Sequence, residues 1–474
     1  MSNAVPAAKA VAPSAPVTGR PGGLNLGALF AASIGAIVAQ IGMISLTQGI
    51  GLGGWGFVAA LVIAFAIALA NAMAYAEMAL MLPSAGSLSS YAEAAIGNFP
   101  AILLVFAGYV TPALFGIPAE LILADRILTQ AVHLALPPFT WPIAIVAVFT
   151  VLNILGTDVF ARVQTALSFV VLAFLGITGL VALGGGGHST VPGGPAAGWA
   201  AMSQHTVTLG LVALAFWVFV GSEFVTPLVP EARRPDRDLP RAMLGGLLAI
   251  FSAQLVFAIG SAQLLPREQL ASSPTPHLDF AVAAYGEGAR IGFALLALLA
   301  SASLINTVLA AVPRMLQGMA ENGQVFPIFK QRSRRFGTPV VAILFVAALP
   351  LVGLLWSGGN VDAILPLMIA ASVAWLLAYM MAQVSLMVLR QRHPSLHRPY
   401  RVPLYPVLPV LALLGMGYVV VNSSPDPAMT PQIVRYTVVV LSLFAVVGAW
   451  WVRFVMKKGL FEPLAPSGAQ GSRP

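Results

Sequence analysis

The chain has 474 residues, of which 58% are apolar and only 8% are charged. Ordinary soluble domains carry roughly 25% charged residues, so this chain could not cover its surface with polar groups and must face lipid. It contains no cysteine, which excludes disulfides, thiolate metal sites and thiol catalysis. The net charge of +8 would suit an anionic partner such as nucleic acid, but the positions of the basic residues explain it as membrane topology.

Apolar segments dominate the chain after its first 22 residues, which lack the apolar run of a signal peptide and predict a disordered cytoplasmic tail. Most segments reach the ~20 residues that a helix needs to cross a bilayer. In chain order they cover residues 26–50, 54–81, 101–133, 139–156, 159–183, 205–230, 240–265, 290–320, 338–356, 361–389, 403–422 and 432–455. We therefore predict an all-α polytopic membrane protein of about 12 transmembrane helices, with a second cytoplasmic tail over residues 457–474.

The basic residues orient these helices. With the N-terminus inside, only Arg126, Arg267, Arg290 and Arg435 lie on the outer side, which leaves 20 of the 24 Lys and Arg residues inside. Cytoplasmic loops of membrane proteins carry such an excess of positive charge. We therefore expect a multi-pass protein of the cell (inner) membrane with both termini in the cytoplasm. Membrane lipids are the expected partners of its basic residues, and nucleic acid is not.

Two of the segments are interrupted by small and polar residues. The first contains Gly35, Gln40 and Gly42, and the sixth contains Gly221-Ser222-Glu223 followed by two prolines. Broken helix is tolerated in hydrocarbon only where it is packed in protein or lines a cavity. The two segments hold corresponding places in two five-helix halves, as in inverted-repeat transporters with a mid-membrane site. Packing of small residues between helices is the alternative, and it stays open for the first segment.

Three stretches between the segments carry a family resemblance. They are Tyr75-Ala76-Glu77-Met78-Ala79 with Leu82-Pro83-Ser84-Ala85-Gly86, then Pro230-Glu231-Ala232 through Asp238-Leu239-Pro240-Arg241-Ala242, and Pro313-Arg314-Met315 with Glu321-Asn322-Gly323 and Phe336-Gly337-Thr338-Pro339. In order and between the right segments, they resemble the amino acid–polyamine–organocation permease family. The resemblance implies a LeuT-like fold with inverted five-helix repeats over residues 24–183 and 205–390 and two further helices over residues 403–456. It also implies alternating access, with substrate between the first and sixth helices.

Glu223 is the first candidate for a chemical role. A carboxylate in the middle of a membrane helix costs several kcal/mol, so it should face a cavity or a partner. It could attract a substrate ammonium or carry a proton during transport. The order from Phe216 to Glu223 resembles a W-x-f-x-G-x-E pattern of basic amino-acid and polyamine permeases. That resemblance implies a substrate site at Trp217, Phe219, Gly221, Ser222 and Glu223, although Trp217 and Phe219 fit simple helix packing equally well.

The first helix departs from the family pattern. Ala39-Gln40-Ile41 stands where a G-S-G triplet usually exposes backbone N–H groups to a substrate carboxylate, which leaves room for an amine without a carboxylate. A shift of one or two residues would instead bring Gly42 into the motif. Glu120, deep in the third segment, is a second acidic candidate for the amine site.

Coupling stays open between protons, sodium and exchange. The fifth segment lacks the lysine of some proton-coupled members, while Ser301 and Ser303 offer hydroxyl groups to a sodium ion. We predict a secondary active transporter of amino acids or related organic amines such as polyamines, by proton-coupled import or exchange. A sodium-coupled amino acid symporter and a receptor that binds without transporting are the alternatives. We expect no enzyme activity, cofactor or metal site, since no catalytic set or metal-ligand spacing is legible, and a homodimer stays an open option.

Overall fold

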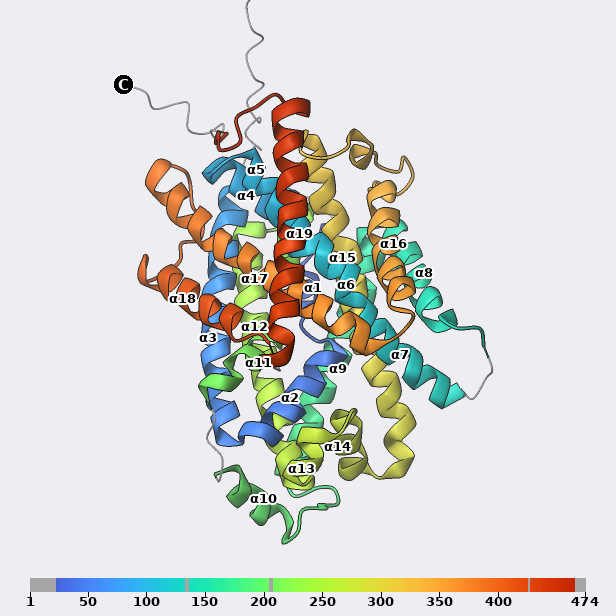
Figure 1. Ribbon diagram of the computed structural model, residues 1–474. Coiled ribbons are helices and arrows are strands. Elements are labelled where there is room, and N and C mark those ends of the chain that lie inside the picture. The colour runs from blue at the N-terminus through green and yellow to red at the C-terminus, as the bar shows by residue number, and fades with distance from the viewer. Residues whose placement is uncertain (1–22, 133–135, 204–207, 425–426, 465–474) are drawn as a thin grey trace, which may run out of the picture.

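A computed structural model describes residues 23–132, 136–203, 208–424 and 427–464. The predicted tail over residues 1–22 and the last residues of the tail over 457–474 lie outside this part. The described residues form a helical bundle, with α4 and α5 at its upper end and α10, α13 and α14 at its lower end (Figure 1). Helices suit lipid because each satisfies its own backbone hydrogen bonds. Only an isolated bridge, from Leu24 to Ala232, has strand-like pairing in the described chain.

The helices follow the predicted segments. Their bounds in chain order are α1 Leu26–Gly35, α2 Gln40–Gly53, α3 Trp55–Met81, α4 Leu88–Ala95, α5 Asn98–Val105, η1 Phe106–Val110, α6 Thr111–Phe115, α7 Ile117–Val132, α8 Thr140–Ile154, α9 Thr157–Leu183, α10 Gly194–Met202, η2 Leu209–Leu211, α11 Val212–Trp217, η3 Ser222–Glu231, α12 Pro235–Leu264, α13 Arg267–Ser272, α14 Pro276–Tyr285, η4 Glu287–Ala289, α15 Arg290–Glu321, η5 Pro327–Lys330, α16 Val340–Ser357, α17 Val361–Arg392, α18 Val407–Val421, η6 Pro427–Met429, α19 Thr430–Trp450 and η7 Trp451–Val455. Here η1 and η7 are π-helical and the other η elements are 3-10 helices.

Nine helical stretches of the described chain are long and apolar enough to cross a membrane, and the bent pair α1 and α2 would make a tenth. The fourth and eleventh predicted segments hold the shorter apolar helices α8 and α18. Each of these has 15 residues, fewer than the ~20 that span a bilayer without local thinning of the lipid. The predicted all-helical polytopic fold is confirmed. Of the 12 predicted transmembrane helices, however, only nine or ten are long and apolar enough in the described chain to cross a membrane.

The first span is broken between α1 and α2, whose axes differ by 61°. The sixth span is broken between α11 and η3, where Gly221 has φ +123°, a conformation that glycine adopts far more readily than other residues. Pro227 and Pro230 then prevent η3 from continuing as a regular α-helix. The two breaks lie side by side, since a Cβ on Gly221 would come within 2.7 Å of the Ala36 Cβ.

Glu77 fastens α3 to the end of α17. Its side chain is fully buried and pairs with Arg390 at 2.5 Å and Arg398 at 3.4 Å. It also accepts the Val402 N–H at 2.6 Å. Removing one partner of such a buried pair typically costs several kcal/mol. This anchor fixes α17, which also carries two side chains of the candidate site.

Candidate functional site

Glu223 lies at the break of the sixth span, and its side chain is completely buried. The Tyr379 hydroxyl donates a hydrogen bond to one carboxylate oxygen, and Trp375 Nε1 donates to the other at 3.3 Å. The same Tyr379 hydroxyl accepts a hydrogen bond of 3.1 Å from the Gly221 N–H. Both aromatic residues belong to α17, so this helix holds the acid and the break beside it.

Two further tyrosines surround this acid with aromatic groups. The hydroxyls of Tyr75 on α3 and Tyr109 on η1 lie 3.0 Å apart. The Tyr75 ring meets the Tyr379 ring edge-on at 5.8 Å, and the Tyr109 ring lies 6.0 Å from the ring of Trp375. None of the ion pairs within the described residues includes Glu223. A carboxylate among aromatic faces suits a cation or a proton, since a buried anion without a partner is costly.

Glu120 is a second buried acid, on α7 of the third span. One of its oxygens accepts the Ile41 N–H at 2.9 Å, and the other accepts the Ser301 hydroxyl at 2.5 Å. Ser301 also lies 3.3 Å from Gln40 Oε1, and Gln40 Nε2 lies 3.4 Å from His277 Nε2. A chain of polar side chains therefore runs from the third span, past the start of α2, to α14.

Gln164 of α9 forms a third polar group, at the break of the first span. Its Nε2 donates to the hydroxyls of Ser303 at 2.7 Å and Ser168 at 2.9 Å. The Ser303 hydroxyl donates to the Gly35 carbonyl at 2.9 Å, and Asn306 Nδ2 donates to Gln164 Oε1 at 2.9 Å. An uncharged amide thus joins α1, α9 and α15 where the first helix ends.

A profile of the amino acid permease family matches residues 24–447, which is most of the chain. The chain belongs to this family. The permease is 25% identical over 413 residues to the branched-chain amino acid permease BcaP of Bacillus subtilis (strain 168), a match that covers 82% of the permease and 85% of BcaP. It is 27% identical over 371 residues to the serine/threonine exchanger SteT of the same strain, covering 74% of the permease and 79% of SteT.

A solved structure shares the fold of the permease over nearly its whole length. This is Mhp1, a nucleobase-cation-symport-1 family transporter in a closed conformation with bromovinylhydantoin bound, with a TM-score of 0.55 and 17% sequence identity. The match covers 96% of the permease and 97% of Mhp1. Together the comparisons confirm the predicted superfamily and LeuT-like fold. They identify the permease as a multi-pass membrane protein and a secondary transporter of amino acids rather than an enzyme.

The predicted residues 39–42 of the permease form the start of α2. Ala39 precedes the helix in extended conformation, and the Gly42 N–H already bonds to the Ala39 carbonyl at 3.1 Å. The Ile41 N–H is held by Glu120, and the Gln40 side chain is turned toward Ser301 and His277. The structure therefore brings this stretch together with Glu120, whereas its contact with substrate stays a prediction.

The remaining predicted residues lie around the break of the sixth span. Ser222 is buried there beside Gly221. Trp217 is half-buried at the end of α11, with its ring edge-on to Phe216. Phe219 instead packs against Phe65 of α3 at 5.9 Å and Phe251 of α12 at 6.0 Å. Contact of Trp217 and Phe219 with a substrate stays a prediction.

Several residues of these polar groups were not predicted from the sequence as site residues, among them Trp375, Tyr379, Gln164 and His277. Each of them carries a polar atom within or beside an apolar stretch. That signal marks them as candidates, but it is shared with many packing residues of membrane helices. Which of them face the breaks depends on the rotation of each helix about its axis, and only the packed bundle shows it.

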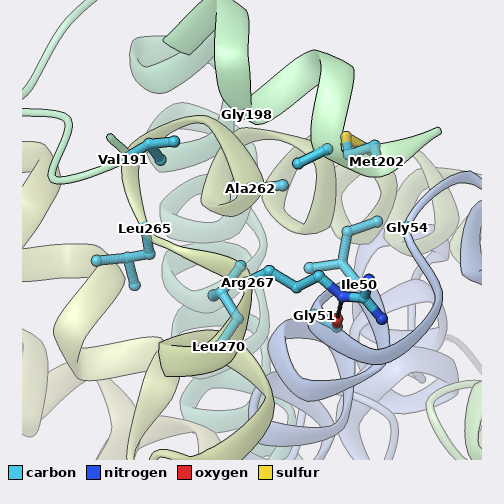
Figure 2. Close-up of a pocket in the computed structure, with 11 residues that line it drawn as sticks. Ile50, Gly51, Gly54, Val191, Gly198, Met202, Ala262, Leu265, Arg267 and Leu270 are labelled. Carbon is cyan, nitrogen blue, oxygen red and sulfur yellow. Dashed lines mark hydrogen bonds between the residues drawn. The ribbon is translucent and has the colours of Figure 1, made fainter. Parts of the chain in front are cut away.

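A small surface hollow lies at the lower end, where α2 ends (Figure 2). Its lining is mainly apolar, with Arg267 reaching across it to donate to the Gly51 carbonyl at 2.5 Å and the Leu52 carbonyl at 2.8 Å. This hollow is at the opposite end of α2 from Glu120. Arg267 caps the end of the broken helix here, and the buried acids elsewhere are the better candidates for the transport site.

Proposed function

We propose that the permease moves amino acids or related organic amines by alternating access, coupled to protons. The observation that carries this proposal is Glu223, a fully buried carboxylate without an ion pair in the described chain, at the break of the sixth span. Ionisable groups inside membrane proteins commonly mark substrate paths and proton relays. Protonation would remove the cost of burying the charge, and an arriving ammonium group would do the same.

The adjacent breaks support a mechanism of alternating access. Broken helices place backbone groups at the middle of the membrane and give each half of a helix freedom to tilt. Ala36 and Gly221 are in close contact, so a movement of one break is transmitted to the other. The hydrogen bond from the Gly221 N–H to Tyr379 links the same break to the helix that holds Glu223.

Sodium coupling is supported less well. The hydroxyl of Ser303, a predicted sodium ligand, accepts a hydrogen bond from the Gln164 amide and donates one to the Gly35 carbonyl. Ser301 donates to Glu120 or Gln40. A sodium ion at these hydroxyls would have to displace the amide, because hard cations require oxygen ligands free of competing donors. We therefore favour the proton over sodium.

Relatives and charge distribution support the remaining details. One relative is a branched-chain amino acid permease and another is a serine/threonine exchanger, so small neutral amino acids are the first substrates to test. Import is the proposed direction, and exchange is the second mode because one relative is an exchanger. The excess of basic residues on one side favours both termini in the cytoplasm of a cell inner membrane.

The test is uptake of labelled amino acids and amines into proteoliposomes under separate proton, sodium and internal-substrate gradients. With one proton per substrate, a gradient of one pH unit supports about tenfold accumulation, equal to about 1.4 kcal/mol. We expect Glu223→Gln to lose this accumulation, because the amide cannot carry the proton. The exposed Glu268→Gln on α13 should behave like the unsubstituted permease.

Three results would contradict the proposal in different ways. Proton-driven accumulation that is unchanged in Glu223→Gln would remove this residue from coupling. Accumulation driven by sodium alone would replace protons with sodium. Binding without uptake under every gradient would favour a receptor.

A further inference from the structure

Glu120 occupies the N-terminal end of α2, a helix of 14 residues. The first N–H groups of a helix lack partners within it, and the helix dipole adds positive potential there, so this end binds anions. In transporters with broken helices, such an end commonly faces the anionic group of the substrate. Here the permease supplies the anion itself, because the Glu120 carboxylate accepts the Ile41 N–H at 2.9 Å.

This internal carboxylate is firmly held. Glu120 is 1% exposed, and its second oxygen accepts the Ser301 hydroxyl at 2.5 Å. The neighbouring N–H of Gly42 is used within the chain, by the Ala39 carbonyl. A substrate carboxylate that approached this helix end would have to displace Glu120 and would meet a like charge at close range.

Neither buried acid has a basic partner in the described part of the chain. Among the described residues, no Lys, Arg or His forms an ion pair with Glu120 or Glu223. A helix N-terminus supplies only about half an elementary charge. His277 does not supply the rest, because burial lowers its pKa to about 3 and keeps the imidazole neutral. The two buried acids near the adjacent breaks therefore have no counter-cation among the described residues.

His277 provides an independent sign that a ligand belongs here. It is 3% exposed and its Nε2 reaches the Gln40 side chain at the start of α2. Its Nδ1 has no hydrogen-bond partner among the described residues. A buried polar atom without a partner is rare in folded proteins, and a polar group of a ligand would satisfy it.

We propose that Glu120 is a built-in anion of the substrate site and selects an organic amine without a carboxylate over the amino acid that has the same side chain. The inference rests on the proposed function insofar as the same central site is the one used in transport. The amine group provides the missing positive charge, while Glu120 takes the place that a substrate carboxylate would otherwise fill. Loss of the Glu120 charge then opens the helix end to carboxylates.

Binding to the full chain in detergent tests this inference separately from transport. The probes are three matched pairs, in which the amine equals the amino acid without its carboxylate: serine and ethanolamine, leucine and 3-methylbutylamine, ornithine and putrescine. At least one amine should bind about tenfold more tightly than its amino acid, as expected for a charge-assisted contact. In Glu120→Gln this ratio should fall by about tenfold or reverse, through weaker amine binding and stronger amino acid binding.

Two control variants separate charge from folding. Glu120→Asp keeps the negative charge and should keep the preference for the amine. Glu287→Gln removes an exposed acid that pairs with Arg290, and it should leave every affinity unchanged. A preference for amino acids in the unsubstituted permease, or a ratio that Glu120→Gln leaves unchanged, would overturn the inference, as would no binding of any amine. Amine binding without uptake in proteoliposomes would instead contradict only the proposed transport.

Discussion

Acids that are buried or partly buried in this permease have very different partners. Glu77 pairs with two arginines, and Glu231 pairs with Arg314 at 2.7 Å. Glu120 and Glu223 instead receive hydrogen bonds from uncharged groups only. A buried carboxylate with a guanidinium partner stays charged and structural, while one without a cation can change its charge during transport. We therefore propose that the arginine-paired acids are structural and that Glu120 and Glu223 act in transport.

Glu93 on α4 allows a test of pH dependence outside the membrane spans. Burial raises the pKa of this carboxyl to about 7, although nearby Lys458 and hydrogen bonds, including one from Asn322 Nδ2 at 2.8 Å, act to lower it. The folded protein therefore keeps the proton at pH values where the unfolded chain, with its ordinary pKa of 4.5, has released it. This contribution to stability is complete below about pH 4.5 and is lost as the pH rises through about 7.

We expect Glu93→Gln to stabilise the permease at pH 8 by about 3 kcal/mol and to flatten the fall in stability between pH 5 and about pH 8. The amide is neutral at every pH and resembles the protonated acid. Thermal unfolding in detergent across this range measures the effect. The exposed Glu268→Gln is the control and should leave the profile unchanged. A parallel shift of both profiles would contradict the assignment to Glu93.

Helix α2 is the element in which tertiary contacts replace local capping. No side chain within its own sequence caps its N-terminus. Glu120 contacts the N-terminal end and Arg267 contacts the C-terminal carbonyls, so an acid and a base match the helix dipole at the two ends. Both come from other helices, at α7 and α13. Contacts from other helices thus hold both ends of this short helix, which begins at the break of its span.

The break of the sixth span gives a test at the same scale. Gly221 has φ +123° and contacts Ala36, so Gly221→Ala introduces both backbone strain and a clash. We expect a loss of ~2 kcal/mol in stability and at least tenfold slower uptake in proteoliposomes. Gly176→Ala is the matched control on α9, because a Cβ there meets nothing within 4 Å. Normal uptake by Gly221→Ala would show that the break tolerates a side chain.

Seen as a whole, the molecule turns its apolar side chains outward as well as inward. Helix α19, drawn in red, runs along the outside of the bundle (Figure 1). Only 11% of the most apolar stretch of its span is buried, the smallest share among the nine long apolar stretches of the described chain. Val438, Val439 and Leu443 on this helix are more than half exposed. In water such a face would lead to aggregation, whereas in a bilayer it meets lipid chains. The predicted homodimer stays an open prediction.

Absence of cysteine makes the orientation easy to test. Ala196→Cys on α10 and Gln331→Cys in the connection between α15 and α16 each introduce a single thiol at an exposed position. Helix α10 and this connection lie at opposite ends of the bundle (Figure 1). In right-side-out membrane vesicles, a membrane-impermeant maleimide should label Ala196→Cys directly. It should label Gln331→Cys only after detergent is added. The reverse pattern would place both termini outside and contradict the positive-inside prediction.

Much of the fold could be predicted because lipid imposes simple rules on sequence. Apolar length marks the spans, and Gly221 and the two following prolines mark the break of the sixth. Glu223 stood out for the same reason, as an acid within an apolar run. The partners of these residues could not be predicted. Tyr379 lies 156 residues beyond Glu223, and no periodic pattern connects them.

The sequence by itself determined the helical class, the family and the two interrupted spans, because composition, short motifs and helix-breaking residues are local properties. Only the tertiary structure decided that Glu120 takes the N-terminal end of α2 and that Gln164 binds Ser303. These contacts join residues 79 and 139 positions apart. They depend on how each helix is rotated and placed against its neighbours, and this follows from the packing of the entire bundle.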